Sequence, residues 1–340
     1  MTHRIPYVDL AAQNGPLREA LIAAVSRVIS HGQFVLGPEV AQLEAALERF
    51  LGVPHVVGVS NGTDALVMAL KLVGVGPGDE VITPSHSFVA TATAVALAGA
   101  RPVLVDIDER TMAISADLVE AAITPRTRAV VPVHLSGFAV DVDRLAAVCE
   151  RRGLALVEDC AQAIGAKHRG RSVGSVGIGC FSMHPLKVLA ALGDAGFITV
   201  ADAGHAERLR HMRNIGLLDR DHCETIDGNT RLDTLQAALV LAKLPGVPGW
   251  IAARRAHADA YRATLGGVVR LPPDEGEGFS VYSAFVVRHP ARDRLRAFLS
   301  DRGIDSKVHY PVPIHRQRAF AHLGVPALPV TDRVCEQILS

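Results

Sequence analysis

The sequence predicts an α/β fold, in which a mainly parallel sheet of seven strands is covered by helices and followed by a smaller C-terminal α+β unit. Three observations lead to this prediction. Between residues 56 and 200, short apolar runs alternate with stretches of helical periodicity. Beyond residue 245, the order changes to strand, helix, strand. The chain has 340 residues, 49% of them hydrophobic, which is enough for one large domain and a small one.

Two helical segments open the chain, over residues 9–30 and 38–51. In the second, Leu43, Leu47 and Phe50 recur at the spacing of one helix face. The strand candidates that follow are VVGVS (56–60), EVITP (80–84), RPVLVDI (101–107), RAVVPVH (128–134), LALVED (154–159), IGCFSM (178–183) and GFITV (196–200). Apolar strands separated by helical stretches are typical of parallel sheets covered on both faces.

The rest of the chain predicts a basic helical stretch at 206–214, a polar loop, and long helices within 231–265. SVYSAFVVR, RDRLRAFLSDRG and IDSKVHYP then predict a strand, a helix and a strand. Because glycine and proline mark loops, the segment PGVPG (245–249) is the expected domain boundary. We therefore expect a large domain over residues 1–245 and a small α+β domain over residues 246–340.

Charge and cysteine usage argue against several classes of protein. Lys+Arg and Asp+Glu both total 35, so the chain lacks the basic excess that a nucleic-acid backbone attracts. Its apolar runs stay below the roughly 18 residues of a membrane span, and its start lacks a signal-peptide pattern. The five cysteines form no CxxC pair, and no HExxH motif occurs. We expect a cytoplasmic protein without a metal, nucleic-acid or membrane partner.

Polar motifs follow several of the predicted strands, and ligands collect at the carboxyl ends of parallel strands. In SNGTDAL (60–66), Gly62 permits close backbone approach, and Thr63 and Asp64 begin a helix whose free N–H groups can bind a phosphate. In VEDCAQA (157–163), Asp159 ends an apolar run and Gln162 follows it. A simple helix N-cap is the alternative interpretation of both motifs.

Two further motifs carry a lysine and an asparagine. FSMHPLK (181–187) places Ser182 at a strand end and Lys187 after a proline turn. A serine hydroxyl can complete a phosphate site, and a lysine amine can form a Schiff base with an aldehyde. A lysine that reaches solvent is the alternative for Lys187. In DGNTRLD (227–233), Asn229 precedes a helix, and a helix cap is the alternative.

Together these motifs match the requirements of pyridoxal 5'-phosphate (PLP). Its phosphate needs helix N–H groups and hydroxyls, and a carboxylate beside its pyridine nitrogen keeps that nitrogen protonated. Its aldehyde needs a lysine that can lose a proton, so burial must lower the lysine pKa from about 10.4. The sequence therefore predicts PLP as the cofactor, with Lys187 and Asp159 as catalytic residues.

At these residues the chain resembles the DegT/DnrJ/EryC1/StrS family of PLP-dependent sugar aminotransferases. The resemblance is carried by VDLAAQNGPLR, FVLGPEV, GVSNGTDAL, GDEVITPSHSFVATATAV, GARPVLVDID, VVPVHLSG, VEDCAQAIGAKHRGRSVGSVG, FSMHPLK, GDAGFITV, GNTRLDTLQAAL and HYPVPIH. It covers nearly the whole chain and implies the type I, aspartate aminotransferase-like fold.

The resemblance also implies roles for individual residues. Lys187 corresponds to the Schiff-base lysine and proton shuttle, and Asp159 to the partner of the pyridine nitrogen. Gln162 would bind near the ring hydroxyl, and Phe88 would stack on the pyridine face. The phosphate would be held by Gly62, Thr63, Asp64 (by its backbone) and Ser182. Asn229 would reach the phosphate in the neighbouring subunit, which implies a homodimer with shared active sites. The sugar pocket would be lined by His184, His309, Tyr310 and His315.

The chain departs from the family pattern at three places. Val188 follows the lysine where asparagine is common, and Ala195 interrupts a GDGG motif. Both departures concern the packing of the lysine loop. The chain ends at CEQILS, where relatives continue with a strand and a helix, so the small domain is expected to be shorter.

The resemblance implies a ping-pong aminotransferase that moves an amino group from L-glutamate or L-glutamine to a nucleotide-linked keto-deoxysugar. The acceptor would be a 3- or 4-keto-6-deoxyhexose, and DLAAQ and FVLGPEV favour the 3-keto form. A keto-cyclitol aminotransferase and a non-catalytic regulatory protein are the alternatives, and the retained Lys187, Asp159 and Ser182 argue against the second. A nicotinamide dehydrogenase does not fit, because the glycine-rich GRSVGSVGIG (170–179) precedes a strand.

Overall fold

A central sheet of seven strands organises the structure, a computed structural model that describes residues 4–340. The strand order is β1-β9-β8-β5-β4-β2-β3. The strands are β1 (His55–Val59), β2 (Glu80–Pro84), β3 (Arg101–Val105), β4 (Thr127–Val130), β5 (Ala155–Asp159), β8 (Ile178–Ser182) and β9 (Gly196–Val200). β9 runs antiparallel to both β1 and β8, and the pairs from β3 to β8 are parallel. The predicted sheet of seven mainly parallel strands is confirmed.

Alternate residues of the central strands enter two different cores. Phe181 and Phe197 stack with their ring centroids 4.4 Å apart and belong to the core under α3 (Pro38–Leu51). Their neighbours in the chain, Cys180 and Ile198, belong to the core on the opposite face, under α4 (Gly62–Leu72). Successive strand residues point to opposite faces, so a sheet covered on both faces needs continuous apolar strands.

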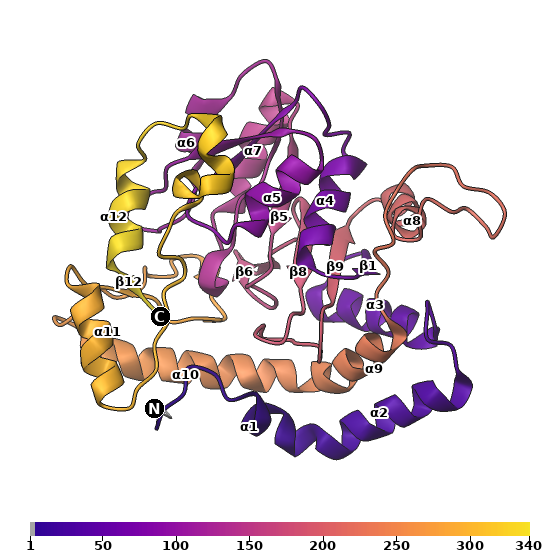
Figure 1. The fold of residues 1–340 in the computed structure, drawn as a ribbon, viewed down its shortest axis with the longest axis horizontal. Helices are drawn as coiled ribbons and strands as arrows, with labels where there is room; N and C mark the ends of the chain where they lie inside the picture. Colours follow the sequence, from indigo (N-terminus) through magenta and orange to yellow (C-terminus); the bar gives the residue numbers. More distant parts are fainter. Residues whose placement is uncertain (1–3) are drawn as a thin grey trace.

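Helices cover the sheet on both faces and extend from it (Figure 1). The N-terminal helices are α1 (Leu10–Asn14) and α2 (Arg18–His31), and they confirm the helical periodicity predicted there. The helices between strands are α5 (Ala90–Leu97), α6 (Ala116–Ala122), α7 (Val142–Arg152) and α8 (Ala203–Met212). The C-terminal third contributes α9 (Thr234–Lys243), α10 (Val247–Leu265), α11 (Arg292–Asp301) and α12 (Pro329–Gln337).

The expected loop at 245–249 is instead helical. A 3₁₀ turn, Leu244–Gly246, joins α9 directly to α10. Pro245 and Pro248 each lie at the start of a helical element, where the missing N–H group costs no hydrogen bond. Figure 1 shows α9 and α10 as one long element that runs beneath the sheet. The division into domains at 245/246 stays a prediction.

The C-terminal unit contains less strand than its sequence predicts. Within 280–288 the structure forms only β11 (Val287–Arg288), and its partner is β12 (Ile338–Leu339) at the end of the chain. The described segment 304–311 contributes a single bridge, from Ile304 to Ile5, and no strand. Pro311 and Pro313 lack the N–H donors that a strand ladder requires. A small three-stranded sheet joins β6 (Lys167–His168), β7 (Arg171–Ser172) and β10 (Gly278–Phe279).

The helical stretch 234–265 is long and apolar enough, by length and composition, to cross a membrane. Core helices pass the same test, and this is weak evidence for a span. α9 packs in a core with α2, through Ala24, Val28 and Ala238. Its apolar face is therefore used inside the protein.

Lys243, at the end of α9, is a buried lysine outside the predicted site. Its side chain is among the largest that are fully buried, with 1% of the residue exposed, and its Nζ donates to Asn14 Oδ1 over 2.9 Å. Burial lowers the pKa of Lys243. An amide oxygen offsets only part of the cost of removing an ammonium group from water.

We expect Lys243→Met to stabilise the protein by about 1 kcal/mol near neutral pH. A lysine whose pKa is lower in the folded protein than in the unfolded chain destabilises the folded protein most at pH values below its folded pKa. This cost falls as the pH rises from the folded pKa to the unfolded pKa of about 10.4. The advantage of Lys243→Met in chemical denaturation should therefore shrink between neutral and alkaline pH. Lys167→Met, at an exposed lysine, is the control. A less stable Lys243→Met at neutral pH would contradict the prediction.

Candidate active site

The start of α4 forms a compact anion site beside Ser182. Asn61 is the N-cap, and its side chain accepts the N–H of Asp64 over 2.8 Å. The Asp64 carboxylate accepts from the side chains of Asn61 and Ser60, which fixes this turn. A Cβ atom built on Gly62 would lie 2.7 Å from the Cβ of Ser182. Glycine is therefore required for this approach, which places a serine hydroxyl at the N-terminus of a helix, where the first backbone N–H groups find no acceptor within the helix.

Asp159 lies one strand away, at the carboxyl end of β5. β5 and β8 are parallel, and Asp159 pairs with Cys180, two residues before Ser182. The residue is 5% exposed, and its carboxylate accepts hydrogen bonds from Thr91 Oγ1 at 2.8 Å and from the Ala161 N–H at 3.1 Å. Burial raises the pKa of Asp159, while these two donors and the charge of Lys187 oppose the rise.

A buried network braces β5 behind Asp159. Glu158 accepts the backbone N–H groups of Gly174 and Gly177, and one of its oxygens lies 3.0 Å from His134 Nε2. His134 Nδ1 accepts the N–H of Val140, so Nε2 carries the proton that faces Glu158. His134, Glu158 and Cys160 stand within 4.8 Å of one another, a spacing that could hold a metal. The hydrogen bonds already use the facing atoms of His134 and Glu158, so we interpret this trio as a structural brace.

Lys187 lies in a half-buried position on the loop between β8 and β9. Burial lowers its pKa, and the negative charge of Asp159 opposes this effect. The backbone of the loop is held by hydrogen bonds from Met183 N–H to Ala195 O and from Ala191 N–H to Met183 O. Val188 and Ala195, the two departures from the family pattern, are both fully buried, so they affect packing.

Gln162, Phe88 and Tyr310 converge from three separate segments. Gln162 Nε2 donates to the Tyr310 hydroxyl over 3.1 Å, and its Oε1 accepts the N–H of Ser136 over 2.8 Å. The rings of Phe88 and Tyr310 lie 5.4 Å apart, and Phe88 remains 51% exposed. Burial raises the pKa of Tyr310 to about 12, so this hydroxyl stays protonated at neutral pH. These residues form an aromatic wall with fixed polar groups beside Asp159.

The histidines that the sequence assigned to a sugar pocket occupy different environments. His309 packs on the Tyr7 ring at 5.6 Å, and both burial and the charge of Lys187 lower its pKa. His184 is exposed near Lys187. His315 is buried, with Nδ1 2.7 Å from Ser85 Oγ and Nε2 3.1 Å from Asp332 Oδ1. Its side chain therefore joins the C-terminal unit to the segment before Phe88.

Asn229 lies on the surface, in a bridge with Asn214. The next residue, Thr230, accepts the N–H of Ser60 over 2.8 Å. This contact places the segment beside the start of α4. The predicted role of Asn229 toward a neighbouring subunit stays a proposal.

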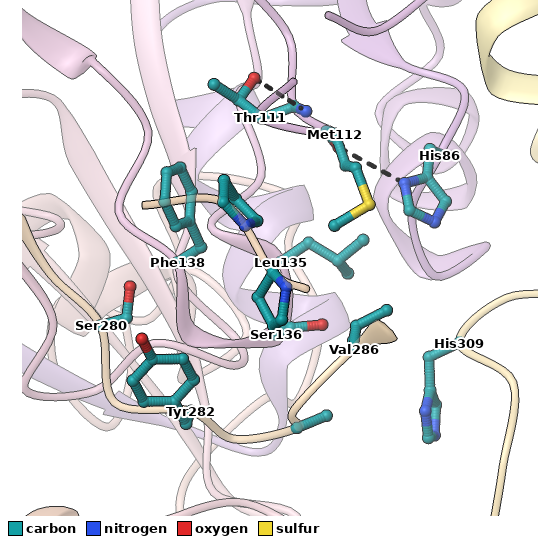
Figure 2. Close-up of a pocket in the computed structure, with 14 residues that line it drawn as sticks. His86, Thr111, Met112, Leu135, Ser136, Phe138, Ser280, Tyr282, Val286 and His309 are labelled. Atoms are coloured by element: carbon teal, nitrogen blue, oxygen red, sulfur yellow. Dashed lines mark hydrogen bonds between the residues drawn. The ribbon is translucent and has the colours of Figure 1, made fainter. Parts of the chain in front are cut away.

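A small cavity of about 40 Å³ is lined in part by Ser136, whose N–H donates to Gln162, and by His309, which precedes Tyr310. Figure 2 shows His86 and Met112 on one side of it, and Tyr282, Val286 and His309 on the other. His86 is buried, which lowers its pKa. Sequence reasoning missed His86, although it stands between a strand end and Phe88. It also missed Tyr282, which the fold brings across from the C-terminal unit.

Comparisons with known proteins find the same family of aminotransferases along nearly the whole chain. Residues 16–340 match the model of the DegT/DnrJ/EryC1/StrS aminotransferase family. The chain is 42% identical over 338 residues to UDP-N-acetyl-3-dehydro-alpha-D-glucosamine 3-aminotransferase of Acidithiobacillus ferrooxidans, covering 99% of this chain and 92% of that protein. It is 42% identical over 344 residues to dTDP-3-amino-3,4,6-trideoxy-alpha-D-glucose transaminase of Streptomyces venezuelae, covering 100% and 91%. A crystal structure of S. venezuelae DesV in complex with ketimine intermediate superposes with a TM-score of 0.97 at 43% identity, covering 100% and 93%.

The cofactor of these aminotransferases is PLP, and solved neighbours include forms with PLP and with PMP. The residues present here fit that group. The close approach of Gly62 to Ser182 leaves a cradle that a Cβ would fill, and a buried carboxylate and a lysine of lowered pKa lie nearby. With its type I fold and this donor set, the chain belongs to the DegT/DnrJ/EryC1/StrS family of PLP-dependent aminotransferases.

Proposed function

We propose that this enzyme transfers an amino group from L-glutamate or L-glutamine to a nucleotide-linked keto-deoxysugar, by a ping-pong mechanism in the cytoplasm. The acceptor is a 3- or 4-keto-6-deoxyhexose, and the 3-keto form is favoured. Two relatives at 42% identity carry names that specify amino transfer at carbon 3 of a UDP- or dTDP-linked sugar. The five free cysteines, four of them buried, suit a reducing compartment.

The observation that carries the proposal is the Gly62–Ser182 cradle at the end of β8, beside the strand that ends at Asp159, with Lys187 on the loop that leaves β8 five residues after Ser182. When bound, PLP supplies an electron sink that makes the proton next to the transferred nitrogen acidic. Lys187 Nζ, its pKa lowered by burial, is suited to take up that proton and return it. Asp159 would hold positive charge at the ring nitrogen, and Phe88, whose ring packs against Tyr310, would stack on the pyridine face.

We also propose a homodimer with shared active sites. Phe34, Val35 and Leu36 expose apolar side chains beside α9, where Thr234 N–H donates to Phe34 O over 3.2 Å. Leu186 and Leu192 expose further apolar surface on the lysine loop. Leu192 N–H donates to Gln236 of α9. The apolar segment at Phe34–Leu36 and the apolar residues of the lysine loop therefore both contact α9. Exposed apolar groups of this kind are typical of protein interfaces.

A parallel acceptor screen tests the proposed function. The purified enzyme is converted to its amine form with L-glutamate or L-glutamine, and the return of the aldehyde form is followed by absorbance as ketones are added. We expect turnover with 3-keto-6-deoxyhexoses linked to dTDP or UDP, slower turnover with 4-keto isomers, and none with keto-inositols. Preference for keto-inositols would overturn the sugar assignment in favour of a cyclitol aminotransferase. Failure of both donors and all ketones would contradict the proposed reaction.

A further inference from the structure

The hydroxyl of Thr91 is the side-chain group that holds the Asp159 carboxylate within the described residues. Oδ2 accepts from Thr91 Oγ1 at 2.8 Å, and Oδ1 accepts from the backbone N–H of Ala161 at 3.1 Å. An ionised carboxylate offers about four acceptor positions, so each oxygen keeps capacity for a ligand. The side chain is thus fixed at both oxygens and still able to bind a cation.

The direction of these hydrogen bonds follows from a proton count. Thr91 Oγ1 also lies 2.8 Å from Ser87 Oγ and 3.2 Å from the carbonyl oxygen of Phe88. Thr91 has one hydroxyl proton, and an ionised Asp159 can only accept. The short, charge-assisted contact to Asp159 therefore takes that proton, and Ser87 donates its own to Thr91. The result is a directed chain from Ser87 through Thr91 to Asp159.

The position of these hydrogen bonds indicates what Thr91 does. Thr91 is 1% exposed and lies in the first turn of α5, three residues after Phe88. The segment that leads into α5 thus carries an aromatic ring at the site, and the first turn of the helix carries a hydroxyl that reaches the carboxylate of β5. α5 lacks a side-chain N-cap, and Thr91 donates across to another element. A threonine hydroxyl that only stabilised the start of its own helix would bond to nearby backbone groups and would need no carboxylate partner.

We propose that Thr91 is a positioning residue for Asp159, which orients the carboxylate toward the pyridine nitrogen of PLP and keeps it ionised. This inference rests on the proposed role of Asp159. Burial raises the pKa of Asp159, and the hydrogen bond from Thr91 is the largest opposing contribution. Without that donor, Asp159 is more readily protonated and less able to hold a cationic ring nitrogen.

The test measures the dissociation constant of PLP from cofactor-free protein by equilibrium dialysis, together with thermal unfolding of that protein. Thr91→Val removes the hydroxyl at similar volume and should weaken PLP binding about tenfold, as expected for losing a hydrogen bond to a charged group. Thr91→Ser retains the hydroxyl and should remain within about twofold of wild type. Thr83→Val makes the same substitution at a buried threonine whose hydroxyl donates to the carbonyl oxygen of Val131 over 2.9 Å, so it is the matched control and should also remain within about twofold. Should the valine variant fail to fold, Thr91→Ala supplies the same comparison.

A double-mutant cycle with Asp159→Asn separates positioning from general packing. In the Asp159→Asn background, Thr91→Val should cause little further loss of PLP affinity, because the carboxylate that it serves is gone. An equal loss in both backgrounds, or a Thr91→Val affinity within twofold of wild type, would overturn the inference. If Asp159→Asn itself leaves PLP binding and transamination unchanged, the proposed role of Asp159 fails instead.

Discussion

Replacing Lys187 with alanine is expected to reduce amino transfer by about four orders of magnitude, because the group that moves the proton is lost. The visible absorbance band of lysine-bound PLP should disappear as well. Steady-state kinetics and the absorbance spectrum of the purified variant measure the two effects. Lys307→Ala is the matched control, since Lys307 pairs with Asp305 at 3.2 Å and has no assigned role. An unchanged spectrum in Lys187→Ala would remove Lys187 from the mechanism.

The same variant tests the shared active site. Asn229→Asp places a negative charge where the partner's phosphate is proposed to bind, so it should also be inactive. In a heterodimer of the two variants, one of the sites combines an intact Lys187 with an intact Asn229. Mixing after reversible dissociation should therefore restore about a quarter of wild-type activity. Recovery is not expected when both changes are in one chain, and its absence in the mixture would contradict the shared-site arrangement.

Gly62→Ala is expected to weaken PLP binding about tenfold to a hundredfold, the range that forced overpacking produces. The added methyl would lie 2.7 Å from the Cβ of Ser182, so α4 or β8 must move and the phosphate cradle must open. Equilibrium dialysis of PLP measures the effect. A smaller increase in melting temperature on adding PLP provides an independent readout.

Gly249→Ala is the control for this substitution. Gly249 is also near the start of a helix, and a Cβ there would meet no atom within 4 Å. It should bind PLP as the wild type does, with equal or higher stability. If both alanine variants bind PLP equally well, the close approach of Gly62 to Ser182 is not what forms the phosphate site.

The sequence predicted the structure best where a pattern of residues fits only one kind of element. Apolar runs of strand length predicted β2 and β9 at their observed bounds, because buried strands need side chains of this kind on both faces. Asp159 and Ser182 were placed together because both end strands of one sheet. The reversed direction of β9 could not be predicted, since an apolar run carries no signal for strand direction.

Other features depended on contacts between distant residues. Proline and glycine at 245–249 suggested a loop, yet the same residues suit the first turn of a helix. The burial of His315 depends on Ser85, and the lining of the cavity depends on Tyr282, each brought from another part of the chain. Thr91 lies in a stretch that reads as an ordinary helix, and only the fold shows that its hydroxyl reaches Asp159.

The helical run from α9 through the 3₁₀ turn into α10 is uninterrupted, and it makes contacts with two distant segments of the chain. In the first half of α10, Arg254 donates to the carbonyl oxygens of Tyr282 and Ser283. In α9, Gln236 accepts the backbone N–H of Leu192 over 3.0 Å, in the loop that bears Lys187. The segment of Tyr282 that lines the cavity and the loop of the proposed Schiff-base lysine therefore share one continuous helical support.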